Sequence, residues 1–459
     1  MSAHLPEHVY HVTVVSNFAR AFDKYSRLYN KSAIAESTFP DKFFVLSRKD
    51  LAIGIEKARR LLAKLALPGD RLLVLEAHLD PALLQPNLAT GRGRYLPGAA
   101  LPVSEVYWVS DQSDLMATCV EEALAASLAC LTPHLQPYAA LKPRTFSVLP
   151  IALACQAKCR FCFSESSASL EQRAKLADVA LAERWMAPAA EAGAERFVIT
   201  GGGEPGLLTH SSLVALMKAG KHYFPKVVLI TNAVHLAKRS HLERAEMLME
   251  YAAAGLSVLA ISRHHDDPAR NAGIMGIDTG TERVLETCRN LYNIRPADVR
   301  LRLICVLQKD GIETGADIAR YLDWAQKQGV DEVCFKELYV STTLESAYPA
   351  KPENAWSQAN QVPLSVLTEA LPSLGYEAAG ALPWGAPLFQ KHLSDGRLFR
   401  VAAYTEPSLF WERTHGIARS WNLMADGTCL VSLEDPSSCI TLPGAPARRV
   451  IPVRALSQN

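Results

Sequence analysis

The sequence predicts an α/β fold, namely a partial (β/α)6 TIM-type barrel preceded by an N-terminal α/β domain and followed by a C-terminal mixed α+β extension. From Phe146 onward, short apolar runs rich in valine, isoleucine, leucine and phenylalanine alternate with longer segments of helical periodicity, which is typical of strand–helix units around a parallel sheet. Several helical segments end in glycine, as helix C-termini commonly do. Six repeats are too few for a closed eight-stranded barrel, so we expect an open or partial one.

The strands of the barrel are expected at six apolar runs, residues 146–153, 196–200, 226–231, 256–262, 299–307 and 332–340. The region before them has its own strand and helix patterns, including a helix expected over residues 115–131. The extension is expected to cover the mouth of the barrel and to contain a hairpin turn at Asp426 and Gly427. The expected domain limits are therefore 1–142, 143–345 and 346–459.

Composition excludes several classes of protein. The 459 residues are 49% hydrophobic, and 48 basic residues nearly cancel 47 acidic ones, so no global positive field favours a nucleic-acid partner. No signal-like N-terminus and no run long enough to span a bilayer are present, so we expect a cytoplasmic protein without a membrane partner. The ten cysteines have no regular pairing pattern, which agrees with a reducing compartment that keeps thiols available for metal.

Three cysteines lie close together in the stretch IALACQAKCRFCFSES, which follows the first expected barrel strand. Cys155, Cys159 and Cys162 have thiolates suited to an iron–sulfur cluster, but a four-iron cluster ordinarily takes four cysteines. Three ligands leave one iron with an open coordination position, which catalytic metal sites keep and structural sites close. Two alternatives stay open: a zinc site completed by a distant histidine or cysteine, or three buried thiols that act as small apolar residues.

Other polar and glycine residues follow the later strands. In ITGGGEPGLL, Gly202 and Gly203 allow close backbone approach to a ligand, and Glu204 can accept a hydrogen bond from an ammonium group. Asn232 and Ser262 end the third and fourth strands, and the active sites of parallel barrels gather at those ends. The alternatives are an ordinary glycine-rich turn and side chains that only cap the next helix.

The spacing CxxxCxΦC, with Phe161 in the aromatic position, and the GGEP segment at Gly202 to Pro205 together resemble the radical S-adenosylmethionine (radical SAM) superfamily. The resemblance implies a 4Fe-4S cluster held by Cys155, Cys159 and Cys162. It also implies S-adenosylmethionine (SAM) chelated to the open iron through its amino and carboxylate groups. An external one-electron reductant such as flavodoxin or ferredoxin is a further implied partner.

The resemblance also implies contacts between the chain and SAM. Gly202, Gly203 and Glu204 would hold the methionine amino group. The resemblance assigns further cofactor contacts, at ribose, carboxylate or adenine, to Asn232, Ser262, Arg263, Val306 and Leu307. Ala233 departs from the family pattern, in which glycine is frequent at that position, and this puts a direct backbone contact there in doubt.

The substrate is less determined by the sequence. Lys336 and Glu337 on the sixth strand are candidates to bind or protonate it, although an internal ion pair is an equal alternative. The same two possibilities hold for a polar loop after the fourth strand, His264, His265, Asp266, Asp267 and Arg270. An aromatic and polar part of the extension is a third candidate region, with Trp384, Tyr404, Glu406, Trp411, Arg419 and Asn422.

The other seven cysteines contain no CxxC pair, so we expect a single cluster. Our leading hypothesis is a radical SAM enzyme that abstracts hydrogen from a small molecule. One alternative is a peptide-modifying maturase, which a free strand edge in the N-terminal domain would support. The other is a non-catalytic iron–sulfur or zinc protein.

Overall fold

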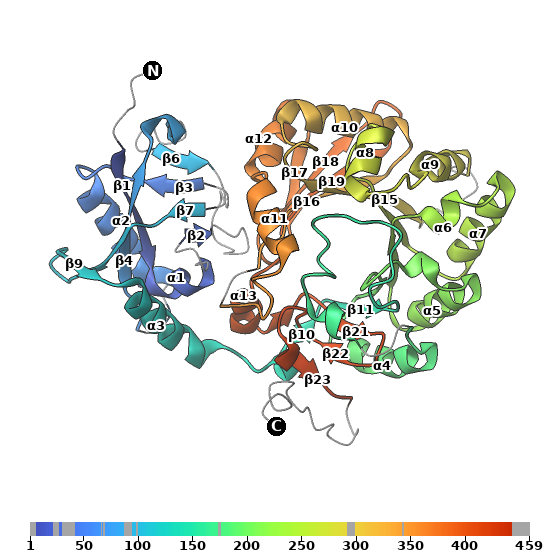
Figure 1. The fold of residues 1–459 in the computed structure, drawn as a ribbon, viewed down its shortest axis with the longest axis horizontal. Helices are drawn as coiled ribbons and strands as arrows, with labels where there is room; N and C mark the ends of the chain where they lie inside the picture. The colour runs from blue at the N-terminus through green and yellow to red at the C-terminus, as the bar shows by residue number, and fades with distance from the viewer. Residues whose placement is uncertain are drawn as a thin grey trace.

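The structure is a computed structural model in which a larger body built on one long sheet lies beside a smaller N-terminal part (Figure 1). None of the described helices is long and apolar enough to cross a membrane. The structure describes residues 6–21, 27–29, 42–65, 67, 69–86, 94–97, 100–172, 176–291, 299–341 and 344–442.

The N-terminal part is built on a four-stranded antiparallel sheet in the order β1-β4-β8-β9. Residues alternate between its two faces, so that Val9 and Leu75 pack with Phe18 on one face while Tyr10 and Ile55 pack on the other. The elements of this part are β1 (Glu7–Val14), α1 (Val15–Ala21), β2 (Arg27–Tyr29), β3 (Lys42–Val45), α2 (Leu51–Leu65), β4 (Leu72–Leu79), β5 (Gln85–Pro86), β6 (Arg94–Pro97), β7 (Ala100–Pro102), β8 (Glu105–Val109), β9 (Leu115–Thr118) and α3 (Val120–Leu131).

The prediction of a helix over residues 115–131 was wrong for its first residues. Its first four residues form β9, which pairs with β8, and the helix α3 begins only at Val120. The Cys119 Sγ accepts a hydrogen bond from the backbone N–H of Glu122, so Cys119 caps the helix. The apolar pattern alone did not separate an edge strand from the helix that follows it.

The larger body has six parallel strands that lie side by side in chain order, where the sequence predicted barrel strands. The fold is therefore α/β with a large parallel sheet. These strands are β11 (Thr145–Leu149), β12 (Arg196–Ile199), β13 (Lys226–Thr231), β14 (Val258–Ser262), β15 (Arg300–Leu307) and β16 (Glu332–Glu337).

The C-terminal segment adds strands to both edges of this sheet. β19 (Leu398–Tyr404) pairs in parallel with β16, and β21 (Trp421–Met424) pairs in parallel with β11. The hairpin predicted at Asp426 and Gly427 is confirmed, since it joins β21 to β22 and Gly427 has a φ of 85°. The other strands are β10 (Lys142–Pro143), β17 (Glu377–Ala381), β18 (Pro387–His392), β20 (Ile417–Ala418), β22 (Cys429–Leu430) and β23 (Cys439–Ile440). The domain limits at 142 and 345 stay predictions.

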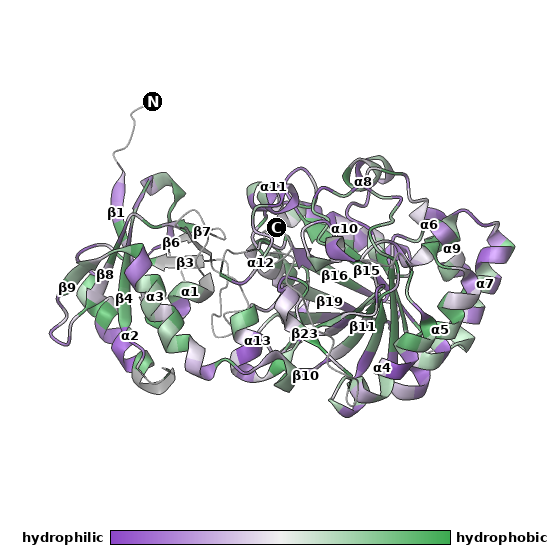
Figure 2. Ribbon diagram, turned by 60° about the horizontal axis from the view of Figure 1, so that its bottom comes forward, coloured by the Kyte–Doolittle hydropathy of each residue, from purple (hydrophilic) through white to green (hydrophobic). Residues whose placement is uncertain are grey.

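Helices follow the parallel strands and lie along the outer side of the sheet, as Figure 1 shows for α4, α5, α7, α9 and α10. Figure 2 shows mostly hydrophobic strands and more hydrophilic helix surfaces, the pattern expected when helices cover a sheet. The helices are α4 (Val179–Glu191), α5 (His210–Tyr223), α6 (Val234–Ala237), α7 (His241–Ala253), α8 (Pro268–Met275), α9 (Thr281–Asn290), α10 (Gly315–Lys327), α11 (Pro352–Asn360), α12 (Ser365–Ser373) and α13 (Leu409–His415).

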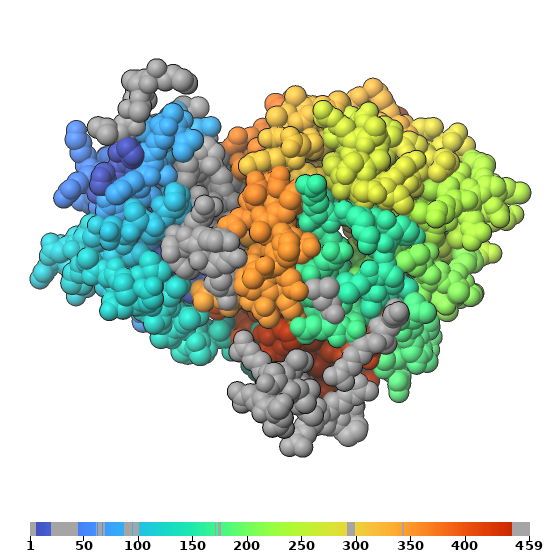
Figure 3. All heavy atoms as spheres, viewed as in Figure 1, coloured from blue at the N-terminus to red at the C-terminus, as the bar shows by residue number. Residues whose placement is uncertain are grey.

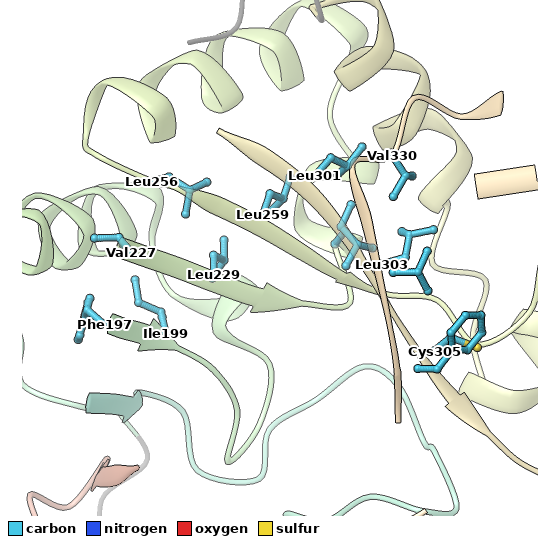
Figure 4. Packing of buried hydrophobic residues seen from close by; sticks show 14 of the residues in the cluster. Phe197, Ile199, Val227, Leu229, Leu256, Leu259, Leu301, Leu303, Cys305 and Val330 are labelled. Carbon is cyan, nitrogen blue, oxygen red and sulfur yellow. The ribbon is translucent and has the colours of Figure 1, made fainter. Parts of the chain in front are cut away.

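Alternate residues of each parallel strand point to opposite faces, and this separates the core from the site. Phe197, Ile199, Val227 and Leu229 belong to the buried cluster that Figure 4 shows between sheet and helices. Their neighbours Val198 and Ile230 belong to a smaller cluster and also line a cavity on the other face. One face of the sheet therefore packs against the helices, and the other face lines the cavity.

Candidate active site

A cavity of about 480 Å³ lies on the inner face of the parallel sheet. Its walls come from the loop after β11, from strands β11 to β16, and from the C-terminal segment around β19 and β21. Figure 3 shows a hollow beside the teal-green atoms of the segment that follows β11. A volume of this size suits a cofactor or a small ligand.

Most of the residues proposed from the sequence line this cavity. They are Cys155, Cys159, Phe161, Cys162, Gly203, Glu204, Asn232, Ser262, Val306, Lys336 and Glu337. Gly202, Arg263 and Leu307 do not line it. The agreement reflects the common edge at which parallel strands end.

The cysteine-bearing loop is held by backbone contacts at its base. Leu153 donates its N–H to the Gly202 carbonyl at 3.0 Å, and Glu204 donates its N–H to the Ala154 carbonyl at 2.8 Å. Leu153 itself has a φ of 54°, in the left-handed region that non-glycine residues seldom adopt. The strained turn directs the chain from β11 across the end of β12, so that Cys155 faces the cavity.

Two glycines make this close approach possible. A Cβ at Gly203 would lie 2.3 Å from the Ala154 carbonyl oxygen, and a Cβ at Gly202 would lie 2.9 Å from the Ile151 carbonyl oxygen. Any side chain would therefore push the two segments apart. In this structure Gly202 acts by packing beneath the loop, since it does not line the cavity.

The three thiols are half-buried, and burial raises the pKa of each. The pKa of Cys159 rises to about 12, through burial first and then through the neighbouring Cys162 and Cys155. Without a positive partner, these groups stay protonated near neutral pH. A bound metal would supply the charge that stabilises thiolates.

The spacing of the sulfurs does not favour a mononuclear zinc site. Thiolates around one tetrahedral zinc, with bonds of about 2.3 Å, lie about 3.8 Å apart. Among the described residues, one set of three possible ligand atoms lies within 4.8 Å of one another, and it is not Cys155, Cys159 and Cys162. A wider separation is what a cluster of several irons requires.

Glu204 is a buried carboxylate that ties the loop after β12 to the end of β13. Its Oε1 accepts hydrogen bonds from the Gly206 N–H at 2.8 Å and from the Thr231 hydroxyl, and its Oε2 accepts from the Asn232 N–H at 2.8 Å. Burial raises the pKa of Glu204, while these three donors oppose the rise. The donors fix the carboxylate at the cavity wall, where it can receive an ammonium group.

Asn232 connects the end of β13 with the cysteine loop. Its Nδ2 lies 3.7 Å from the Cys155 Sγ and 3.3 Å from the Gln156 Oε1. The next residue, Ala233, has a φ of 63°, so this position requires the backbone conformation that glycine adopts most easily. The departure from glycine noted in the sequence therefore keeps the turn but adds local strain.

Ser262 ends β14 and Arg263 follows it, but the two side chains have different surroundings. Ser262 lines the cavity. The guanidinium of Arg263 is 1% exposed and forms an ion pair with Glu282 at 2.6 Å, away from the cavity. The contact of Arg263 with a cofactor stays a prediction that this geometry does not favour.

His264 lines the cavity and contacts two proposed residues. Its ring meets the Phe161 ring edge-on, with centroids 5.0 Å apart, and its Nδ1 accepts the Val306 N–H at 3.2 Å. Burial, with the nearby Arg263 charge, lowers the pKa of His264 to about 3. The ring is therefore neutral, and its Nε2 carries the proton. Leu307, beyond Val306, packs into the main core instead.

Another part of the cavity lining is a charged network around Glu406. This carboxylate accepts hydrogen bonds from Lys336 at 3.2 Å and from the Tyr404 hydroxyl at 2.9 Å, and it forms an ion pair with Arg419. Burial lowers the pKa of Lys336 to about 8. The neighbouring Glu337 accepts a hydrogen bond from Thr405 at 2.9 Å.

Two arginines that line the cavity were missed in the sequence. Arg144 precedes β11, and Arg196 begins β12, where it pairs with Thr145. Burial lowers the pKa of Arg196, and the charges of Arg302 and Arg144 lower it further. Like charges therefore crowd together at this end of the cavity. An arginine at the start of a strand resembles an ordinary solvated strand end, so no local signal marked them.

The donor set fits the two groups implied by the resemblance. Three half-buried thiols line one wall, and beside them stand a fixed carboxylate and a backbone turn held open by glycine. Charged side chains, among them Lys336 and Glu406, line the same cavity. One cavity thus offers thiols that can hold a metal cluster and charged groups that can bind a polar ligand.

Comparison with known proteins agrees with the motif. Residues 149–322 match the family model described as the Radical SAM superfamily. No curated protein is significantly similar to the chain in sequence.

Solved structures were also compared. A structure of Streptococcus suis SuiB bound to S-adenosylmethionine is 16% identical, with 70% of this chain and 67% of that chain covered and a TM-score of 0.43. SuiB bound to its precursor peptide SuiA is 17% identical, with coverages of 69% and 65% and a TM-score of 0.39. Escherichia coli HemN, a coproporphyrinogen III oxidase described as a radical SAM enzyme, is 15% identical, with coverages of 56% and 57% and a TM-score of 0.32.

Proposed function

We propose that the chain, whose residues 149–322 match the Radical SAM superfamily, uses a 4Fe-4S cluster and SAM as cofactors and abstracts hydrogen from a small anionic molecule. The observation that carries the proposal is the charge of the cavity lining. Lys336, Arg196 and Arg419 line the same cavity as the cysteine loop and Glu204.

Cys155, Cys159 and Cys162 would hold a single cluster at the cavity. Glu204 would accept the methionine ammonium group, and Asn232 and Ser262 would contact the rest of the cofactor. When bound, the cluster would supply the one-electron chemistry that cleaves SAM to methionine and a 5′-deoxyadenosyl radical. An external one-electron donor such as ferredoxin or flavodoxin would supply the electron.

Phe161 and His264 would shape the cofactor pocket. The neutral imidazole offers its Nε2–H as a donor while its Nδ1 is held by Val306. Because the pKa of His264 is lowered to about 3, this donor persists through the neutral pH range. The residue would bind or orient a ligand, not exchange protons with it.

The charges of the cavity lining favour an anionic substrate. Arg144, Arg196, Lys336 and Arg419 line the cavity together with Glu337 and Glu406. Arg196 is crowded by like charges, so a carboxylate or phosphate placed beside it would relieve repulsion and gain charge-assisted hydrogen bonds. A substrate enclosed in the cavity would also exclude water, which protects a reactive radical from side reactions.

The test uses the anaerobically reconstituted enzyme with SAM and dithionite, and measures 5′-deoxyadenosine. Small molecules from a cell extract that bind an anion exchanger should stimulate cleavage. The ratio of cleavage with and without this fraction should fall at least about tenfold in Arg196→Gln, which corresponds to about 1.4 kcal/mol. In Arg300→Gln, whose arginine begins β15 on an exposed site, the ratio should stay the same. Equal ratios in the two variants would exclude Arg196 from substrate binding.

One observation favours a second candidate, a peptide substrate. β9 is the last strand of the N-terminal sheet, and its Leu115 and Met116 are 36% and 50% exposed. Such an edge can add a peptide strand. In the same assay, stimulation by the macromolecular fraction, abolished by a Met116→Lys change, would favour the peptide over the small molecule.

A further inference from the structure

The N-terminal part contains a second cluster of metal-ligating side chains, far from the cysteines in sequence. On β1 and β4, which Figure 1 shows as neighbours, His8 pairs directly with His78, and Glu76 lies two residues before His78 on the same face. The three possible ligand atoms all lie within 4.8 Å of one another. The antiparallel register alone therefore brings two imidazoles and one carboxylate together.

The geometry of the three groups is close to that of a metal site. The His8 Nδ1 lies 2.5 Å from the Glu76 Oε1, and the His78 Nε2 lies 3.4 Å from the same oxygen. Zinc bonds of about 2.0 to 2.1 Å in tetrahedral geometry place ligand atoms about 3.3 Å apart. Small rotations of the two imidazoles would open the cluster to that spacing.

Exposure allows an ion to enter while the carboxylate stays fixed. The Glu76 side chain is 8% exposed, whereas those of His8 and His78 are 60% and 45% exposed. The second oxygen of Glu76 accepts a hydrogen bond from the Tyr107 hydroxyl at 2.8 Å. A ligating carboxylate is typically oriented by such an outer hydrogen bond.

We propose that His8, Glu76 and His78 bind one divalent zinc ion, with water in the remaining position. Two imidazoles and a carboxylate form a donor set that zinc prefers. The alternative is a simple ion pair between Glu76 and a protonated histidine. That alternative leaves the two rings, whose centroids lie 4.1 Å apart, competing for one oxygen, while a cation bonds both nitrogens at once.

The site would fasten the first strand of the sheet. β1 lies at the end of the four-stranded order and pairs with β4. A zinc ion that bridges His8 on β1 to Glu76 and His78 on β4 would resist separation of these strands. The inference is independent of the radical chemistry and of the cysteine loop.

The experiment titrates zinc chloride into the cluster-loaded enzyme by calorimetry and measures the melting temperature with and without zinc. The wild-type protein should bind one zinc ion more per chain than His78→Ala or His8→Gln, and zinc should raise its melting temperature only when both histidines are present. His222→Ala, at an exposed histidine of α5, should behave as the wild type. Zinc bound by cysteine thiols elsewhere in the chain contributes equally to the wild type and the variants, so it does not affect the difference in stoichiometry.

Because His8 and His78 are exposed, neither change should prevent folding. A lower stoichiometry in both histidine variants, with wild-type binding in His222→Ala, supports the site. Equal zinc stoichiometry in the wild type and in His78→Ala would overturn the proposal.

Discussion

Gly203 lies so close to Ala154 that a Cβ on the glycine would stand 2.3 Å from the alanine carbonyl oxygen. Ala154 is the residue before Cys155, and its carbonyl also accepts the Glu204 N–H. The glycine-rich turn and the cysteine loop are therefore one packed unit. The GGEP segment positions the cysteines as well as offering Glu204 to a ligand.

Gly203→Ala should displace the cysteine loop. The new methyl group meets backbone atoms that cannot rotate away, so we expect lower iron content after reconstitution and at least about tenfold slower 5′-deoxyadenosine formation, about 1.4 kcal/mol. Gly273→Ala is the matched control, because a Cβ there meets no atom within 4 Å in helix α8. Unchanged iron content in Gly203→Ala would show that the loop tolerates the shift.

Glu204→Gln should weaken SAM binding with less effect on the cluster. Three donors converge on the carboxylate, so the amide nitrogen of glutamine would face a donor and the negative charge would be lost. We expect an increase of at least about tenfold in the Kd for SAM, about 1.4 kcal/mol, measured by equilibrium dialysis. Iron content should stay near that of the wild type, and a normal Kd would contradict the role of Glu204.

Glu412→Gln tests how the stability of the protein depends on pH. Burial, with the nearby Glu345, raises the pKa of Glu412 to about 8. Since the folded pKa lies above the unfolded value of 4.5, the stabilising contribution is complete below pH 4.5 and is lost as pH rises through 8.

The free energy of unfolding of the wild type should therefore fall between pH 5 and pH 8 by at least about 1 kcal/mol relative to Glu412→Gln. Urea unfolding at several pH values measures the difference. A glutamine accepts the same Arg419 N–H but cannot ionise. Parallel pH curves for the two proteins would show that Glu412 is ionised throughout.

His264→Phe should destabilise the protein through Val306. The buried Val306 N–H would lose its acceptor, which costs about 1 to 3 kcal/mol in the free energy of unfolding. His222→Phe, at an exposed position, should change stability by less than about 0.5 kcal/mol. Equal stabilities of the two variants would mean that the hydrogen bond contributes little.

Features set by short-range pattern could be predicted from the sequence. The six parallel strands and the cysteine loop depend on apolar periodicity and on cysteine spacing, and both lie within a few residues. Glycine at 202 and 203 was expected to allow close backbone approach to a ligand, and the structure shows close approach to Ile151 and Ala154 of the chain itself.

Features that depend on pairing between distant segments of the chain could not be predicted from the sequence. The attachment of β19 to β16 and of β21 to β11 brings together segments far apart in the chain. The sequence named Glu406 and Arg419 as candidates, but it did not show the strand pairing that places them at the cavity wall. Arg196 gave no signal, because a charged residue at the start of a strand is usually solvated. The cofactor contact of Arg263 stays a prediction, which its ion pair with Glu282 does not favour.

The most direct test of the account measures iron content and 5′-deoxyadenosine in the anaerobically reconstituted protein after reduction with dithionite. We predict about four irons per chain and SAM-dependent 5′-deoxyadenosine in the wild type and in Cys439→Ala, whose cysteine lies outside the cavity. Cys159→Ala should lose both. Equal 5′-deoxyadenosine formation by Cys159→Ala, or none by the iron-loaded wild type, would contradict the account.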